Sequence, residues 1–175
     1  MLIRAFHDLD REVVDRLLAE AFSGPQPGGS PAASPPIEVV LNAALLGSVE
    51  FIPELALVAE LDGAVVGYCI TTRGWIGDRP ALGLGPIGVD PGVQRGGIGS
   101  ALVRETLRLA TVRGEWVVAL LGDPAYYGRF GFVPSTDLGI VAPEPAWGAY
   151  FQAARLDPGE TPVGTFRYAA PFEAF

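Results

Sequence analysis

Residues 81–103, ALGLGPIGVDPGVQRGGIGSALV, join an apolar run to a helical pattern through a glycine-rich turn. Apolar residues occupy even positions at 82 and 84 but odd positions at 87 and 89. Because side chains alternate between the faces of a strand, this change of phase at Gly85-Pro86 needs one extra residue if the strand continues. The pattern fits a bulged strand that bends away from its neighbour, and equally a strand that ends early at Pro86. A bulge would open a gap in the sheet that could receive a ligand.

The glycines that follow stand at the start of the helical pattern. A helix start offers unpaired N–H groups and the positive end of the helix dipole, and glycine lets an anion approach the backbone closely. Gln94 and Arg95 stand just before it and could add donors to phosphate oxygens. The stretch therefore favours a pyrophosphate cradle, although a glycine-rich turn that merely feeds a helix has the same appearance. It lacks the Lys-Ser/Thr pair of a P-loop and the G-x-G-x-x-G spacing of a dinucleotide fold.

Upstream of residue 81, the sequence predicts a first strand, two helices and then two further strands. Two β-rich runs flank Asp62-Gly63, a dipeptide that accepts the positive φ of a tight hairpin turn. The expected elements are a strand at 2–6, a helix at 9–22 capped by Asp8, a surface loop at 23–36, a helix at 37–50, strands in 54–61 and 64–72, and a linker at 73–80.

The downstream half alternates between helix and strand. It predicts a helix at 96–114, a strand at 115–122, a short helix at 123–131 and isolated strands in the tail such as 165–170. This order indicates an α+β fold with a mixed, mostly antiparallel sheet flanked by helices. At 175 residues the chain is expected to form one domain, residues 1–175.

The composition of the chain excludes several classes of function. The net charge of −8 argues against a nucleic-acid partner, which would need a basic face. The apolar runs are too short to cross a membrane, and the N-terminus does not read as a signal peptide, so a cytoplasmic location is expected. A single cysteine, Cys69, provides neither a disulfide framework nor a metal cluster, and it reads as a small buried strand residue. All twelve basic residues are arginine, which excludes lysine Schiff-base chemistry.

Gln94-Arg95-Gly96-Gly97-Ile98-Gly99 resembles the (Gln/Arg)-x-x-Gly-x-(Gly/Ala) signature of the GNAT superfamily of acetyl-CoA-dependent N-acetyltransferases. The block LLGDPAYYGRFGFVP, residues 120–134, is similar to the second half of that superfamily's site. The hairpin PELALVAELDGAVVGY and the tail resemble the bacterial YhbS-like branch. The resemblance covers nearly the whole chain, and residues 23–36 match least.

The resemblance implies a GNAT-like sheet with a bulged, splayed central strand. It also implies that backbone N–H groups of the signature hold the pyrophosphate of coenzyme A, while the bulged strand binds the pantetheine and polarises the thioester carbonyl. The cofactor-binding residues implied in this way are Ile87, Gly88, Val89, Gln94, Arg95, Gly96, Gly97, Ile98, Gly99 and Ser100.

The catalytic acid implied by the resemblance is Tyr127, at the family's spacing before Phe130-Gly131-Phe132. A phenol keeps its proton at neutral pH and can share it with a departing thiolate. Packing in the core is the alternative role of Tyr127, and the adjacent Tyr126 is expected to point elsewhere. Asp123 is a second catalytic candidate, although Asp-Pro before a helix is first of all a helix cap.

The sequence does not identify a general base. Glu54 and Asp78 are candidates near the hairpin and the loop, neither stronger than a solvated carboxylate, and His7 reads as a surface or capping residue. A neutral amine reaching the site through ordered water would need no base.

The leading prediction is therefore direct transfer of an acetyl group from acetyl-CoA, a co-substrate, to a primary amine of a small molecule or peptide in a ternary complex, without a metal. A non-catalytic acyl-CoA sensor of the same fold is the alternative, and a nucleotide-binding domain is a weaker one. The sequence is compatible with a homodimer and does not determine the oligomeric state. The acceptor walls are expected within residues 22–54, 73–80 and 134–162.

Overall fold

The computed structural model describes residues 1–23, 35–159 and 163–174. Most of the loop expected at 23–36 lies outside the described residues. The described helices are α1 (Arg11–Ala21), α2 (Ile37–Leu46), α3 (Ile98–Val112) and the one-turn α4 (Pro124–Tyr127). The strands are β1 (Leu2–Ala5), β2 (Ala56–Leu61), β3 (Ala64–Ile76), β4 (Arg79–Val89), β5 (Val117–Leu121), β6 (Val133–Pro134), β7 (Ile140–Val141), β8 (Phe151–Arg155) and β9 (Gly164–Arg167).

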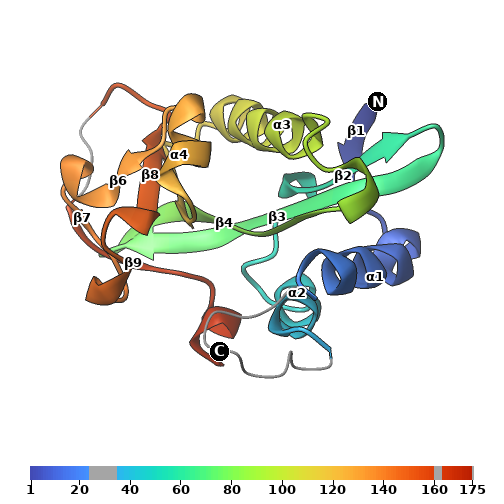
Figure 1. Cartoon of the computed structure of the whole chain (residues 1–175). Coiled ribbons are helices and arrows are strands. Elements are labelled where there is room, and N and C mark those ends of the chain that lie inside the picture. The colour runs from blue at the N-terminus through green and yellow to red at the C-terminus, as the bar shows by residue number, and fades with distance from the viewer. Residues whose placement is uncertain (24–34, 160–162, 175) are drawn as a thin grey trace.

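The strands form a mixed sheet in the order β1-β2-β3-β4-β5-β8-β6, with β9 beside the far end of β3. Along that order only the pair β4–β5 is parallel, as far as the described residues show. Helix α3 covers one face of the sheet, and α1 and α2 cover the other (Figure 1). The α+β architecture predicted from the sequence is confirmed.

The two faces of β3 explain this layering. Tyr68 is fully buried in the core beneath α1 and α2, whereas Cys69 packs with Leu102 of α3 on the opposite face. Gly67 brings α3 close, because a Cβ atom at that position would lie 2.7 Å from the Cγ2 atom of Ile98. Apolar residues on both faces thus hold β3 at the centre of the molecule.

Two tight turns join β2, β3 and β4. The predicted turn at Asp62-Gly63 is confirmed, with φ of 52° and 83°. The linker predicted at 73–80 is wrong, because β3 continues to Ile76 and β4 begins at Arg79, directly opposite it in the ladder. Gly77, with φ of 57°, makes the turn between them. β3 and β4 are therefore two long strands that pair with each other in the middle of the sheet.

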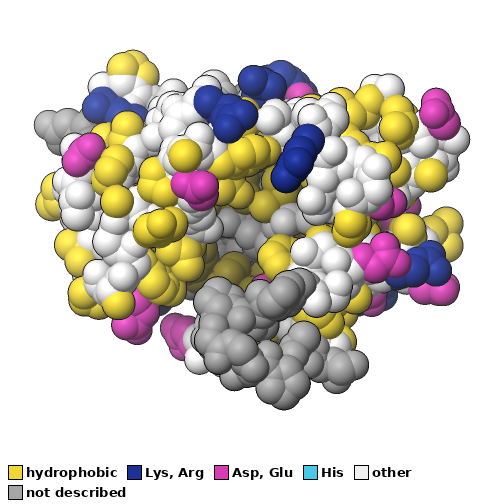
Figure 2. Space-filling view, viewed as in Figure 1, with side chains coloured by type: hydrophobic (Ala, Val, Ile, Leu, Met, Phe, Trp, Pro, Cys, Tyr) yellow, Lys and Arg dark blue, Asp and Glu magenta, His cyan; other side chains and the backbone are white. Residues whose placement is uncertain are grey.

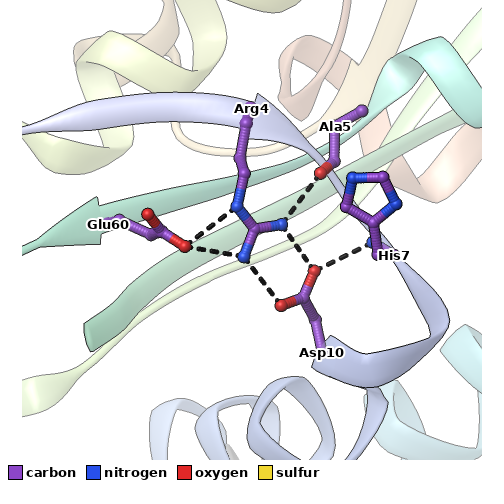
Figure 3. Close-up of polar contacts among 5 residues, drawn as sticks. All are labelled: Arg4, Ala5, His7, Asp10 and Glu60. Carbon is purple, nitrogen blue, oxygen red and sulfur yellow. Dashed lines mark hydrogen bonds and ion pairs between the residues drawn. The ribbon is translucent and has the colours of Figure 1, made fainter. Parts of the chain in front are cut away.

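The start of the first helix is held by Asp10 rather than by the predicted Asp8. The Asp10 carboxylate accepts hydrogen bonds from the His7 backbone N–H at 2.8 Å and from both terminal nitrogens of Arg4, at 2.7 and 2.8 Å (Figure 3). Arg4 also contacts Glu60 at 2.6 Å, which ties β1 and β2 to the entry of α1. The hydrogen bonds from Arg4 hold the pKa of Asp10 below its usual range.

Candidate active site

The phase change at Gly85-Pro86 is a β-bulge, and the alternative of an early strand end is wrong. In the ladder, Cys69 lies opposite Ile87 and Thr71 lies opposite Leu84. Two residues of β4 therefore face a single residue of β3, and β4 continues to Val89. Gly85 has φ of 144°, a conformation that favours glycine.

The bulge separates β4 from its other neighbour. The parallel pairing between β4 and β5 is limited to Leu82 with Val118 and Gly83 with Ala119. Beyond Gly83 the two strands diverge, so the edge of β4 that faces β5 has no ladder partner among the described residues. Residues at the end of β4, at the start of α3 and in α4 line one cavity, so the gap lies beside the start of α3 and beside α4.

The start of α3 is shaped by the glycine-rich turn. Gly97 is the N-cap residue with φ of 86°, and Arg95 before it has φ of 64°. The first turn of a helix leaves N–H groups without intrahelical partners, here at Ile98 and Gly99. The Gln94 amide donates to the Val89 carbonyl at 3.1 Å and so fastens this turn to the end of β4.

A cavity of about 630 Å³, here called the α3-side cavity, opens between this helix start, the end of β4 and α4. Its charged side chains among the described residues are Arg95 and Arg129. Of the ten predicted cofactor-binding residues, Gly96 alone is absent from the described lining. The lining consists of Ala21, Phe22, Ile87, Gly88, Val89, Gln94, Arg95, Gly97, Ile98, Gly99, Ser100, Tyr126, Tyr127 and Arg129.

Tyr126 and Arg129 are residues of this cavity that the sequence reasoning missed. The Tyr126 hydroxyl lies 3.5 Å from the Ser100 Oγ, and the Arg129 guanidinium stacks on the Tyr126 ring at 4.8 Å. A Cβ atom at Gly99 would lie only 2.9 Å from the Tyr126 hydroxyl. Tyr126 therefore faces the helix start instead of pointing elsewhere. Its position beside Tyr127 was the available signal.

Tyr127 lies at the junction of two cavities. A second cavity of about 410 Å³, the α2-side cavity, lies between β4, the end of β5, the end of α1 and α2. Phe22, Ile87 and Tyr127 line both cavities. The Tyr127 ring is 9% exposed and packs edge-on against Tyr126 at 4.9 Å. No described residue hydrogen-bonds its hydroxyl, and burial raises its pKa, so the phenol keeps its proton.

Asp123 acts as a helix cap, the first of its two predicted roles. Its Oδ1 atom accepts a hydrogen bond from the Ala125 N–H at 2.9 Å, and Pro124 follows as the first helical residue. The side chain is exposed and also lines the α2-side cavity. Asp123 therefore lies in the same cavity lining as Tyr127. Its catalytic role stays a prediction.

The other candidate bases are distributed over the surface. Glu54 pairs with Arg113 at 3.3 Å, and His7 is exposed at the entry of the first helix. Asp78 lines a third cavity that is described below. Among residues 1–23, 35–159 and 163–174, no cluster of three or more His, Cys, Asp and Glu is placed to hold a metal ion.

Cys69 is fully buried, as predicted, with its Sγ atom 3.4 Å from the Thr106 hydroxyl. Burial raises the pKa of its thiol to about 12. A thiol in this state is a poor nucleophile, so Cys69 is unsuited to carry an acetyl group.

The α3-side cavity suits an anionic ligand. It combines the positive end of α3, backbone N–H groups exposed by glycine and two arginines. A splayed β-strand beside a glycine-rich helix start, with a tyrosine at the gap, is the arrangement that the resemblance to the GNAT superfamily implies. No helix in the described part of the chain is long and apolar enough to cross a membrane.

Comparison with known proteins identifies the family. A model of the acetyltransferase (GNAT) domain matches residues 53–134. YhbS of Escherichia coli K12, an uncharacterized N-acetyltransferase, is 30% identical over 161 residues, which span 89% of this chain and 87% of YhbS. YjhQ, an uncharacterized N-acetyltransferase of the same organism, is 35% identical over 113 residues, or 62% of either chain. The chain belongs to the GNAT superfamily of N-acetyltransferases and resembles its YhbS-like branch.

Two solved structures show the same fold. The crystal structure of E. coli YhbS in complex with CoA has a TM-score of 0.87 and 28% sequence identity, and the comparison covers 99% of this chain and 92% of that one. A GNAT family acetyltransferase from Brucella melitensis in complex with acetyl-CoA has a TM-score of 0.77 and 31% identity, with 98% and 97% of the two chains covered.

Proposed function

We propose that residues 1–175 form one N-acetyltransferase domain that moves an acetyl group from acetyl-CoA directly to a primary amine. One observation carries this proposal: Tyr127 and Ile87 line two adjoining cavities at the gap in the sheet, one at the start of α3 and one beside α2. A donor on the α3 side and an acceptor on the α2 side would meet at the Tyr127 hydroxyl. Both substrates would then be bound together, and no acyl-enzyme would be needed.

The α3-side cavity fits coenzyme A, the group found in the two related structures. We assign the pyrophosphate to the backbone of residues 97–100, with Arg95 and Arg129 adding positive charge. The unpaired edge of β4 at residues 87–89 would hold the pantetheine arm and present N–H donors to the thioester oxygen. When bound, acetyl-CoA supplies the activated acyl group.

Tyr127 would act on the leaving sulfur. Its pKa is raised by burial, so the hydroxyl is protonated at neutral pH and has no competing partner among the described residues. A phenol in this state donates a hydrogen bond to a developing thiolate, and because its pKa lies above that of a thiol, it shares the proton rather than losing it.

The attacking amine must be neutral. We propose that water in the α2-side cavity takes its proton, assisted by Asp123, which is the predicted candidate carboxylate in the described lining of that cavity. Asp123 remains the weaker of the two catalytic proposals, since its Oδ1 atom already caps α4.

The experiment follows the thiol of coenzyme A as it is released. Purified protein is incubated with acetyl-CoA and a panel of primary amines, and its melting temperature is recorded with and without acetyl-CoA. We expect a rise in melting temperature together with amine-dependent thiol release. A clear rise without release for any amine would favour the acyl-CoA sensor instead. A rise with ATP or NAD but none with coenzyme A would favour a nucleotide-binding domain.

A further inference from the structure

A larger cavity adjoins the α2-side cavity, away from the gap. This third cavity, the aromatic cavity, has a volume of about 800 Å³. Leu121, Tyr168 and Phe172 line both cavities, so the two cavities lie next to each other and share these walls. The described lining of the aromatic cavity is Gly77, Asp78, Leu121, Pro143, Glu144, Trp147, Thr165, Phe166, Arg167, Tyr168, Phe172 and Glu173.

The walls of the aromatic cavity are rings that pack on one another. Tyr168 lies 4.5 Å from Phe172 and 6.4 Å from Trp147, measured between ring centroids. Trp147 and Phe172 are half-buried, so parts of both rings face the cavity. Leu121 is 47% exposed at the end of β5, where the two cavities meet. These surfaces suit an apolar or aromatic body of a ligand.

Charge is divided between the two sides of the gap. The charged residues described around the α3-side cavity are two arginines. The other two cavities are lined by the carboxylates Glu38, Asp78, Asp123, Glu144 and Glu173 and by one described base, Arg167. The Arg167 guanidinium stacks on Trp75 at 5.1 Å and keeps its positive charge, but the carboxylates around these two cavities outnumber it. Figure 2 shows a hollow in the middle of this face, with hydrophobic side chains around it and arginines above it.

We propose that the acceptor is a small diamine in which an apolar body separates the acetylated amine from a second positive charge. The reacting amine enters the α2-side cavity, the body lies against the aromatic walls, and the distal cation faces Glu144 and Glu173 at the exposed end. This inference rests on the proposed acetyl transfer. The carboxylates attract the distal cation and repel the carboxylate group of amines that carry one, such as free amino acids.

Three matched acceptors test the charge preference. They share a biphenyl body and one aminomethyl group, and they carry at the far end an aminomethyl, a methyl or a carboxylate group. The diamine should have the highest kcat/KM, at least about tenfold above the methyl compound, and the carboxylate the lowest. 1,4-Diaminobutane, which lacks the apolar body, should be at least about tenfold poorer than the biphenyl diamine. Equal values across the set would overturn the proposal.

Charge-neutral variants test whether Glu144 and Glu173 cause the preference for an acceptor with a distal cation. The double variant Glu144→Gln/Glu173→Gln should lower kcat/KM for the diamine by about tenfold and leave the methyl compound unchanged. Glu12→Gln, on the exposed face of α1 and outside the three cavities, is the control and should change neither value. An unchanged preference in the double variant would contradict the assignment of the distal cation to these carboxylates.

Binding without turnover separates this inference from the proposed function. The melting temperature is measured with saturating CoA and each amine. If no amine is acetylated, transfer itself fails, and the inference then stands only if the diamine raises the melting temperature more than the methyl and carboxylate compounds. If amines are acetylated without regard to the distal charge, transfer stands and the inference fails.

Discussion

At the scale of single residues, the orientation of Tyr127 depends on a neighbour without a side chain. The Tyr127 ring lies directly over Gly122, the residue after β5, and a Cβ atom there would overlap the ring at Cε2. Gly122 is itself fixed by hydrogen bonds from its N–H to the Tyr150 carbonyl at 2.9 Å and from Gln152 to its carbonyl at 2.8 Å. The glycine is therefore a positioning residue for the tyrosine.

Gly122→Ala should displace the Tyr127 ring and lower kcat by about tenfold or more, because a hydrogen bond to the leaving sulfur depends on its geometry. The dissociation constant of CoA, measured by calorimetry, should stay within about threefold because the α3 start is untouched. Gly128→Ala is the matched control, since its Cβ atom would meet nothing within 4 Å. Equal kcat values in the two variants would show that Gly122 does not position the ring.

At the scale of elements, the strand β4 and the helix α3 make the donor side together. The bulge turns β4 away from β5, and the glycine-rich turn then brings the first turn of α3 beside the exposed edge of β4. Tyr126 of α4 packs against that first turn at Gly99, so the cavity has little room for added atoms there. Gly96 lies outside the described lining.

Gly99→Val should therefore weaken CoA binding by about 100-fold or more before it affects folding, because the new side chain meets the Tyr126 hydroxyl. Gly96→Ala should bind CoA within about threefold of the unchanged protein, since its Cβ atom would contact only the Val93 carbonyl, at 3.1 Å, among the described atoms. The measurements are calorimetric titration and a thermal melt. Loss of binding in Gly96→Ala but not in Gly99→Val would contradict this assignment of the cradle.

The junction of β1, β2 and α1 at Arg4 gives a stability prediction. The Asp10 side chain is 10% exposed and loses its main partner in Arg4→Gln, so the free energy of unfolding at pH 7 should fall by about 1–2 kcal/mol. Because the folded state lowers the Asp10 pKa, its contribution is present above about pH 4, the unfolded pKa, and is lost as the pH falls through the folded pKa.

Urea denaturation at pH 7 and below pH 4 measures both effects. The penalty of Arg4→Gln should shrink in acid, where Asp10 takes up a proton. Arg108→Gln, which removes an exposed pair with Glu105 on α3, is the control and should show no measurable change. An equal loss in both variants, or a penalty that grows in acid, would contradict the role given to Asp10.

The elements that the sequence predicts well are those with local signals. The turn at Asp62-Gly63, the bulge and the helix after the glycines each lie within a few residues of their own pattern. The extension of β3 was missed because Gly74 weakens the strand pattern, yet a Cβ atom there would lie 2.8 Å from the Arg167 carbonyl of the distant β9. β8 was missed because its partners on β5 are about thirty residues away. The aromatic cavity joins residues 77 to 173, so no local pattern announces it.

At the scale of the whole molecule, one splayed sheet separates two chemical environments. The charged residues described around the α3-side cavity are arginines, next to a helix start, whereas the α2-side and aromatic cavities are lined by aromatic rings and mainly by carboxylates. The net charge of −8 is therefore unevenly spread around the gap. An anionic donor and a cationic acceptor would each be drawn to its own side. Tyr127 lines both the α3-side and the α2-side cavity, at the place where donor and acceptor would react.

The most direct test compares turnover and CoA affinity in Tyr127→Phe. This change removes one hydroxyl and leaves the packed ring in place. We predict that kcat for a substrate amine falls by about 100-fold or more while the dissociation constant of CoA stays within about threefold. Wild-type kcat in the variant, or an equal loss of turnover and CoA affinity, would contradict the claim that Tyr127 acts on the leaving sulfur.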